Sequence, residues 1–303
     1  MKLRVATDCS GIEAPIEALI QMKIPFDHIW SCDSDKYVQQ TIAANYSPMY
    51  FYPDITERDN SKLPDIDMYV CGFPCQPFSA LGKQLGTNDP RGNIMLHCIE
   101  TIKIKLPKIF VLENVRRFKS TQKGKPYEYL MKSLREIENS YYNVYSMILN
   151  TKDYGIPQSR TRLFIIGIRK NVQKRELQVP RPKKMKPLES FIIDKTIYKR
   201  IINNKALQKN IDKINNENGC ICTSDTFNTH IKYISPTLTS ICQYLYHTTY
   251  NRYLTHRECL LLQGFKKKLK QVVPDRQFFK QIGNSMSVNV LKEIFNEIFK
   301  TVK

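Results

Sequence analysis

A cysteine set between two prolines is the residue of this sequence best placed to act as a nucleophile. The apolar run Ile66 to Cys71 predicts a short buried strand, and Gly72, Pro74 and Pro77 prevent it from continuing or turning directly into a helix. Cys75 is therefore expected on a stiff loop at the carboxyl end of a strand, where ligands gather in open parallel sheets. A cysteine attacks as its thiolate. Taken alone, Cys75 could equally be a buried structural cysteine.

A carboxylate follows the next predicted strand. The run Ile109 to Leu112 leads directly into Glu113, and a predicted helix over Gly92 to Lys105 connects it to the cysteine strand. A crossover of this kind brings both strand ends to one edge of the sheet, so Glu113 and Cys75 can face one pocket. A thiolate adds to C6 of a pyrimidine only when an acid meets the charge that builds on N3. Glu113 can be that acid if partial burial raises its pKa. The alternative is a carboxylate that only stabilises a helix N-terminus.

Two arginines stand at alternate positions where the chain enters another strand. Arg160 and Arg162 precede the apolar run Leu163 to Ile168, and residues two apart in a strand point the same way. One or both can hold a base oxygen or a phosphate. The alternative is a solvated basic edge.

The first strand and its successors carry the features of a nucleoside site. The run Leu3 to Thr7 ends in a turn containing Ser10, Gly11 and Ile12, and backbone amides at such a helix start can hold a polar group. Asp33 follows the second strand, where a carboxylate accepts bonds from ribose hydroxyls. Asp54 follows another short strand and can receive an adenine amino group. With a single glycine in the turn, a nucleoside cofactor without pyrophosphate fits better than a dinucleotide.

Short β-branched runs alternate with longer amphipathic runs from Leu3 to about Lys170, which predicts βαβ units and a mostly parallel sheet. The fold class is therefore α/β. Past Arg169 this alternation is lost and the sequence becomes strongly basic, with a Pro-rich and Lys-rich linker at 180–187. We expect a second, smaller unit that is mainly irregular and β.

The composition indicates which kind of partner the protein binds and in which kind of compartment it resides. There are 47 Lys and Arg against 28 Asp and Glu, a formal charge of +19, which favours a polyanionic partner. The alternative is a basic protein from an AT-biased coding sequence. Nine scattered cysteines favour a reducing compartment, and Cys220 with Cys222 is too little to predict zinc, so no metal site is expected. We see no signal peptide and no membrane span, and expect a soluble intracellular monomer.

Four motifs, in this order, resemble those of the cytosine-C5 methyltransferases. Gly72-Phe73-Pro74-Cys75-Gln76-Pro77-Phe78-Ser79 is similar to the family's Pro-Cys nucleophile loop, and Glu113-Asn114-Val115 to its Glu-Asn-Val. Gln158-x-Arg160-x-Arg162 is similar to its Gln-x-Arg-x-Arg segment, and Gly283-Asn284-Ser285 to its closing Gly-Asn-Ser. The match covers nearly the whole chain except about Lys170 to Lys232. Four motifs at family-like spacing favour the catalytic interpretation of Cys75 and Glu113.

The resemblance implies a Rossmann-like class I methyltransferase fold, S-adenosylmethionine as methyl donor, and a cytosine flipped out of double-stranded DNA. Cys75 would add to C6, Glu113 would bond N3 and the exocyclic amine, Arg162 would hold O2, and Arg160 would help to order the site. Residues that would bind the cofactor are Ser10, Gly11, Ile12, Asp33, Asp54, Asn284 and Ser285. Residues 1–169 with 275–303 would form the catalytic domain, and 170–274 the target-recognition domain.

The chain departs from the family pattern in its first motif. Cys9 and Glu13 stand where family members usually carry an aromatic residue and a second glycine. Two other functions stay open: the RNA branch of the same family, which methylates transfer RNA, and a catalytically inactive nucleic-acid-binding protein. The segment after Cys75 is more similar to the DNA-acting members. Retention of Cys75, Glu113, Arg160 and Arg162 together counts against an inactive protein.

Overall fold

The structure, a computed structural model, describes residues 2–74, 94–200, 202, 204–213, 217, 219–222, 230–266 and 268–302. Cys75 lies outside the described residues. The chain divides into two compact units. The first comprises Met1–Leu149, Thr161–Pro180 and Ile294–Lys303, and the second comprises Asn150–Arg160 and Arg181–Glu293.

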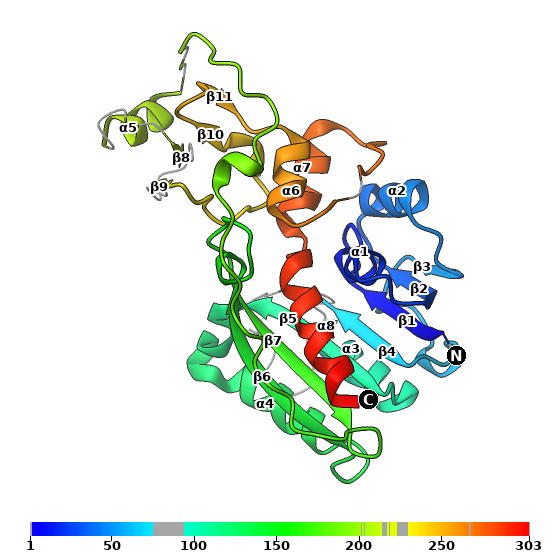
Figure 1. Ribbon diagram of the computed structural model, residues 1–303. Coiled ribbons are helices and arrows are strands. Elements are labelled where there is room, and N and C mark those ends of the chain that lie inside the picture. The colour runs from blue at the N-terminus through cyan, green and yellow to red at the C-terminus, as the bar shows by residue number, and fades with distance from the viewer. Residues whose placement is uncertain are drawn as a thin grey trace. The chain divides into compact units, whose positions relative to one another are not determined.

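The first unit is built on a seven-stranded sheet with the order β3-β2-β1-β4-β5-β7-β6 among the described residues (Figure 1). Neighbouring strands from β3 to β5 pair in parallel, and β7 runs antiparallel to β5. The predicted α/β class with a mostly parallel sheet is confirmed. The strand bounds are β1 Leu3–Asp8, β2 Phe26–Cys32, β3 Tyr50–Tyr52, β4 Met68–Cys71, β5 Ile109–Val115, β6 Tyr142–Asn150 and β7 Thr161–Arg169.

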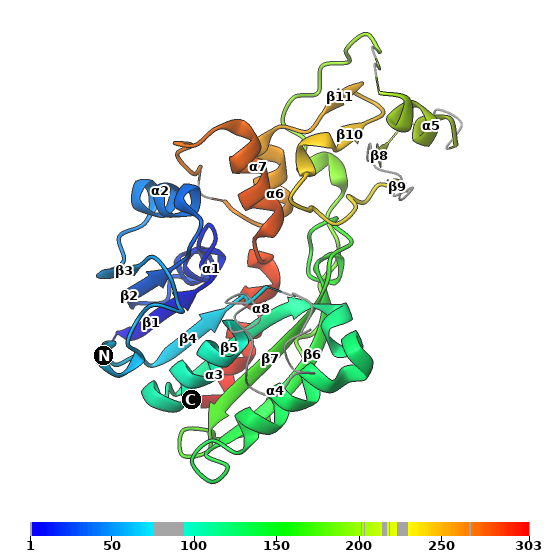
Figure 2. The same ribbon diagram turned by 180° about the vertical axis from the view of Figure 1, so that it is seen from behind.

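Helices cover both faces of this sheet. From β1 the chain crosses toward β2, and from β4 it crosses toward β5 in the opposite direction, so right-handed crossovers put their helices on opposite faces. Helices α3 and α4 lie over one face, and α1 with the C-terminal part of α8 lies over the other (Figures 1 and 2). The helix bounds are α1 Ala14–Gln21, α2 Lys36–Asn45, α3 Ile94–Lys105, α4 Lys125–Arg135 and α8 Val288–Val302.

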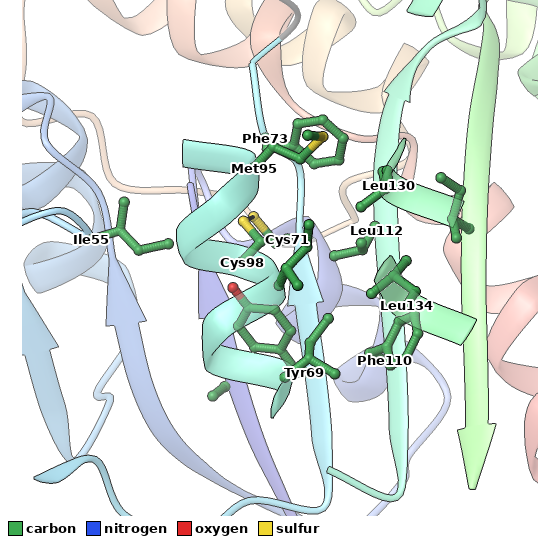
Figure 3. Packing of buried hydrophobic residues seen from close by; sticks show 14 of the residues in the cluster. Ile55, Tyr69, Cys71, Phe73, Met95, Cys98, Phe110, Leu112, Leu130 and Leu134 are labelled. Carbon is green, nitrogen blue, oxygen red and sulfur yellow. Dashed lines mark hydrogen bonds between the residues drawn. The ribbon is translucent and has the colours of Figure 1, made fainter. Parts of the chain in front are cut away.

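The core between the sheet and α3 explains why the sequences of the parallel strands are continuous apolar runs. Met95 and Cys98 of α3 pack against Cys71 and Phe73, at the end of β4 and just beyond it (Figure 3). All four side chains are buried. A parallel strand with both faces covered buries every side chain, and all four residues of β4 are buried. The strand that leads to Cys75 is therefore anchored in the core.

Gly167 of β7 shows how closely the antiparallel pair packs. It lies opposite Phe110 of β5, and a Cβ added to it would come within 2.1 Å of the Phe110 ring. Only glycine leaves room for that ring. The contact fixes β7 against β5, and with it the register that places Arg162 opposite Val115.

The second unit contains little regular structure. Its four-stranded sheet has the order β11-β10-β8-β9 in the described part of the chain, and its strands are only two or three residues long. The expected irregular structure is present, but among the described residues the helices α5, α6 and α7 of this unit are longer than its strands, so the expectation of a mainly irregular and β domain stays a prediction. Its functional role in target recognition stays a prediction. The bounds are α5 Lys205–Lys213, β8 Cys220–Cys222, β9 His230–Lys232, β10 Tyr246–His247, β11 Arg252–Tyr253, α6 His256–Leu262 and α7 Asp275–Asn284.

Helix α6 of this unit begins with a capping box. The Thr255 hydroxyl accepts a bond from the backbone N–H of Glu258, and the Glu258 carboxylate accepts one from the backbone N–H of Thr255. Across the described residues, no helix has the length and apolar character that a bilayer crossing requires.

Candidate active site

An ion pair stands at the carboxyl end of β5. Glu113 and Arg162 lie on the neighbouring antiparallel strands β5 and β7, with Glu113 Oε1 3.2 Å from Arg162 Nε. Their side chains are only 12% and 16% exposed. Burial lowers the pKa of Arg162 and the nearby Glu113 charge opposes that shift, but a guanidinium stays protonated in proteins. The pair therefore presents an acceptor and a donor side by side, which can bond adjacent polar atoms on one edge of a base.

The segment leading to Cys75 is tied to the same strand. Asn114 donates a hydrogen bond from Nδ2 to the carbonyl oxygen of Phe73 at 3.0 Å, and its side chain is buried. The Phe73 ring packs edge-on against Phe118, with centroids 5.4 Å apart. In the sequence, Asn114 stands out only as the middle residue of the Glu113-Asn114-Val115 motif, without a predicted role. Its place beside Glu113 could have indicated one, because an amide side chain can satisfy the backbone of a neighbouring loop.

The turn after β1 and the end of β2 are joined by Asp33. Its Oδ2 accepts a bond from Gly11 N at 2.9 Å and its Oδ1 one from Asp35 N at 3.0 Å. Gly11 has a φ of +54°, and a Cβ added there would meet no atom within 4 Å. Two of the predicted cofactor residues are thus brought together at the carboxyl ends of β1 and β2, and β1 borders the point where the strand order reverses. There is space beside Gly11, and a carboxylate at the end of β2 suits a ribose diol.

The other two predicted turn residues point inward. The Ser10 hydroxyl accepts a bond from Cys32 N at 3.0 Å and lies 2.7 Å from Thr7 Oγ1. Ile12 is fully buried. Both side chains therefore shape the turn, and their contact with a cofactor stays a prediction. Asp54, just beyond β3, accepts two bonds from Thr56, from its N–H and its hydroxyl, each 2.8 Å long.

Glu13, one of the two departures in the first motif, is fully buried beneath this turn. Its Oε1 accepts bonds from Ser31 Oγ at 2.6 Å and Thr7 Oγ1 at 2.8 Å, and His28 Nε2 lies 3.6 Å away. Its backbone is left-handed, with a φ of 60°. Desolvation raises the pKa of Glu13 to about 8, while the bonds from Ser31 and Thr7 oppose that rise. Glu13 adopts the left-handed backbone that the usual glycine would adopt more easily. Its carboxyl group accepts a hydrogen bond from Ser31 and so connects the turn to β2.

A buried ion pair secures the last residue of β1. Asp8 accepts bonds from Trp30 Nε1 at 3.0 Å, Arg58 Nη1 at 2.6 Å and the Tyr69 hydroxyl at 2.6 Å. The Arg58 guanidinium also lies over the rings of Trp30 and Tyr52. Because a buried charge is costly without partners, this network fixes Asp8 and hence the start of the turn.

In the second unit, Arg160 bonds to two backbone carbonyl groups. Its Nη1 donates to the Leu238 carbonyl at 2.6 Å and its Nη2 to the Ser285 carbonyl at 2.7 Å. The side chain is only 3% exposed. This geometry suits a residue that orders the chain around it. Gln158 does the same, since it donates to the Leu262 carbonyl and accepts from Leu238 N.

The closing Gly-Asn-Ser motif packs on the segment that Arg160 holds. A Cβ on Gly283 would lie 1.7 Å from the Thr239 carbonyl oxygen, so that backbone passes directly over the glycine. Asn284 is exposed and Ser285 is buried. Of the predicted site residues, Glu113, Arg162, Ser10, Gly11, Ile12, Asp33 and Asp54 lie in the first unit, and Arg160, Asn284 and Ser285 in the second.

A parallel sheet with a polar turn after β1 and a carboxylate after β2 suits a nucleoside ligand, and in the sequence a Pro-Cys segment follows β4. The sequence profile of the C-5 cytosine-specific DNA methylases matches residues 8–300. The chain belongs to this family, and the resemblance of its motifs is confirmed.

Curated relatives align over most of the chain. Type II methyltransferase M1.ScrFI of Lactococcus lactis subsp. cremoris is 32% identical over 292 residues, which cover 91% of this chain and 72% of the relative. Type II methyltransferase M.NgoBI of Neisseria gonorrhoeae is 33% identical over 275 residues, covering 88% and 84%. Like these relatives, the chain is a methyltransferase, so the expected enzyme class is confirmed.

A solved structure supports the fold over the full length. The Entamoeba histolytica methyltransferase EhMeth aligns with a TM-score of 0.74 at 20% identity, covering 100% of this chain and 99% of that one. At this identity the likeness concerns the fold alone.

Proposed function

We propose that this protein transfers a methyl group from S-adenosylmethionine to C5 of a cytosine flipped out of duplex DNA, with Cys75 as the covalent nucleophile. The observation that carries the proposal is the pairing of Glu113 with Arg162 on β5 and β7, next to the backbone that leads to Cys75. The formal charge of +19 suits a DNA partner. Base flipping costs a few kcal/mol, which contacts to the DNA backbone offset.

The pairing fits one edge of cytosine. The ring carries O2, N3 and the exocyclic amine in sequence along that edge, so Arg162 can donate to O2 while Glu113 bonds N3 and the amine. Addition of the Cys75 thiolate to C6 forms an S–C6 bond and pushes the ring electrons toward N3, where Glu113 shares a proton. C5 then carries the electron pair that takes the methyl group. Loss of the C5 proton to solvent, departure of the thiolate and return of the N3 proton to Glu113 restore the aromatic ring.

The described residues of the first unit fit the cofactor. Gly11 leaves space at the turn, Asp33 offers a carboxylate for the ribose, and Asp54 one for the adenine. When bound, S-adenosylmethionine supplies a methyl group made electrophilic by its sulfonium. Ser10 and Ile12 would act through the shape of the turn, while Asn284 and Ser285 stay predicted contacts. Arg160 would order the chain within the second unit through its bonds to Leu238 and Ser285.

The test is incubation with labelled S-adenosylmethionine and either duplex DNA or transfer RNA, followed by nucleoside analysis. We expect label in 5-methylcytosine from DNA. Cys75→Ser should abolish transfer and keep cofactor binding. Cys242→Ser is the matched control, because this buried thiol donates to the Phe279 carbonyl and serine keeps a donor there. Label in RNA alone, or an active Cys75→Ser variant, would contradict the proposal.

A further inference from the structure

The ten residues after β5 form an exposed basic loop, defined here as residues 116–125. It contains no acidic residue. Five of its side chains are basic and all five are exposed: Arg116, Arg117, Lys119, Lys123 and Lys125. In the described part of the chain, none of the five forms an ion pair. This concentration of unneutralised charge is a local feature, distinct from the overall excess of basic residues.

The basic loop begins two residues after Glu113. Since β1, β2, β4 and β5 are parallel, the loop lies at the same edge of the sheet as the cofactor turn and the start of the cysteine loop. Its fixed point is Phe118, which is fully buried and packs edge-on against Phe73. Phe73 in turn accepts the Asn114 bond. The backbone that carries the basic side chains is therefore anchored next to the strand that holds Glu113.

The backbone of the basic loop is held by local hydrogen bonds and contains two left-handed residues. The Arg117 carbonyl accepts bonds from Ser120 and Thr121, while Gln122 and Lys123 hold left-handed conformations with φ of 49° and 59°. Such conformations cost non-glycine residues about 1 kcal/mol each. Of the five basic residues only Lys125 lies in α4, where the helix dipole favours acidic side chains such as Glu128 in the first turn. Strain and unfavourable charge that persist at a site edge indicate a binding role.

We propose that the basic loop binds the phosphodiester backbone of duplex DNA beside the target cytosine. The inference rests on the proposed function. It assigns the surface of the protein that binds the DNA strand carrying the flipped base. Arginine forks and lysine ammonium groups match phosphate oxygens, and exchanging counterions for these side chains supplies affinity that does not depend on base sequence. No apolar side chain of the loop is exposed, since Phe118 is buried, so a protein partner is less well matched.

The experiment measures duplex DNA binding by fluorescence anisotropy across a range of salt concentrations. One variant changes Arg116, Arg117, Lys119 and Lys123 to glutamine, and leaves Lys125, the first residue of α4, unchanged. The matched control removes four exposed basic side chains near the opposite, amino ends of the parallel strands: Lys23, Lys103, Arg135 and Lys170. The control carries the same change in net charge. Circular dichroism verifies that both variants are folded.

Each phosphate contact that is lost reduces the salt slope of binding by about 1. We expect the slope of the basic-loop variant to fall by at least about 2 and its affinity at least about tenfold. The control should keep the wild-type slope. Equal slopes for wild type and basic-loop variant, or equal losses in variant and control, overturn the inference. The inference is also overturned if the basic-loop variant binds duplex DNA like the wild type and loses affinity only for transfer RNA in the same anisotropy assay.

Methyl transfer by the wild type on the same duplex separates the two proposals. Suppose that the wild type transfers methyl groups and that the basic-loop variant binds the duplex with the same affinity as the wild type. Only the inference about the basic loop then fails. If the wild type binds the duplex but transfers no methyl group, the proposed function fails. A variant of the wild type with lysine in place of Arg116 and Arg117 should keep most of the wild-type salt slope, because both positive charges are retained.

Discussion

Glu13→Gln should remove a pH dependence of stability that the buried carboxyl imposes on the first unit. The pKa of Glu13 is raised by burial from 4.5 to about 8, so between these values the folded chain holds a proton that the unfolded chain has lost. Stability is then complete below the unfolded pKa and declines as pH rises toward the folded one. The slope is about 1.4 kcal/mol per pH unit.

The useful window lies between pH 6.5 and pH 8, because His28 acts in the opposite sense below it. Burial lowers the pKa of His28 from 6.5 to about 4, so its contribution to stability rises with pH between those values and masks that of Glu13. Above pH 6.5 only Glu13 of this pair titrates, and the wild type should lose about 2 kcal/mol by pH 8. Glutamine keeps the accepting oxygen and has no proton to lose.

The assay is urea unfolding at several pH values, followed by fluorescence. Trp30 is the only tryptophan in the sequence and lies in β2, so its signal reports the first unit alone. Glu13→Gln can shift stability by a constant amount, but its curve should be flatter than that of the wild type in this window. Parallel curves would show that the Glu13 carboxyl is already ionised in the folded protein, and would refute the reasoning.

Three further substitutions test the contacts around the site. Gly283→Ala should destabilise the second unit by at least about 2 kcal/mol in urea unfolding, because its Cβ would lie 1.7 Å from the Thr239 oxygen; an unchanged midpoint would contradict this packing. Asn114→Ala should cost about 1–3 kcal/mol, since it leaves the buried Phe73 carbonyl without its donor, and methyl transfer should fall; full activity would exclude a positioning role. Arg160→Lys keeps the charge but loses the fork, and should cost about 1.5–3 kcal/mol in the second unit; wild-type stability would show that the two carbonyl bonds are dispensable.

The order of the elements could be predicted because it depends on local patterns. The apolar run that became β4 is buried on both faces, and the run before Glu113 pairs with it in parallel. Glycine and proline marked the ends of these runs. The motifs therefore fell at the carboxyl ends of strands, where the structure places Gly11, Asp33 and Glu113.

The contacts that organise the site could not be predicted, because they join residues far apart in the sequence. Arg160 bonds to Leu238 and Ser285, 78 and 125 residues away, and no local pattern encodes such a pairing. The sequence marked Glu13 only as a departure from the usual glycine, whereas in the structure it is buried and accepts bonds from Thr7 and Ser31. Hydroxyl groups on neighbouring strands can compensate a buried carboxyl only once the sheet has formed.

Trapping with duplex DNA that carries 5-fluorocytosine tests the central claim most directly. Fluorine at C5 cannot leave as the proton does, so the last elimination is blocked after methyl transfer and the enzyme stays bonded to C6. With S-adenosylmethionine present, we predict a protein–DNA adduct that survives denaturation and maps by mass spectrometry to Cys75. An adduct at another residue, or methylation of ordinary cytosine without any adduct on the fluorinated base, would contradict the account.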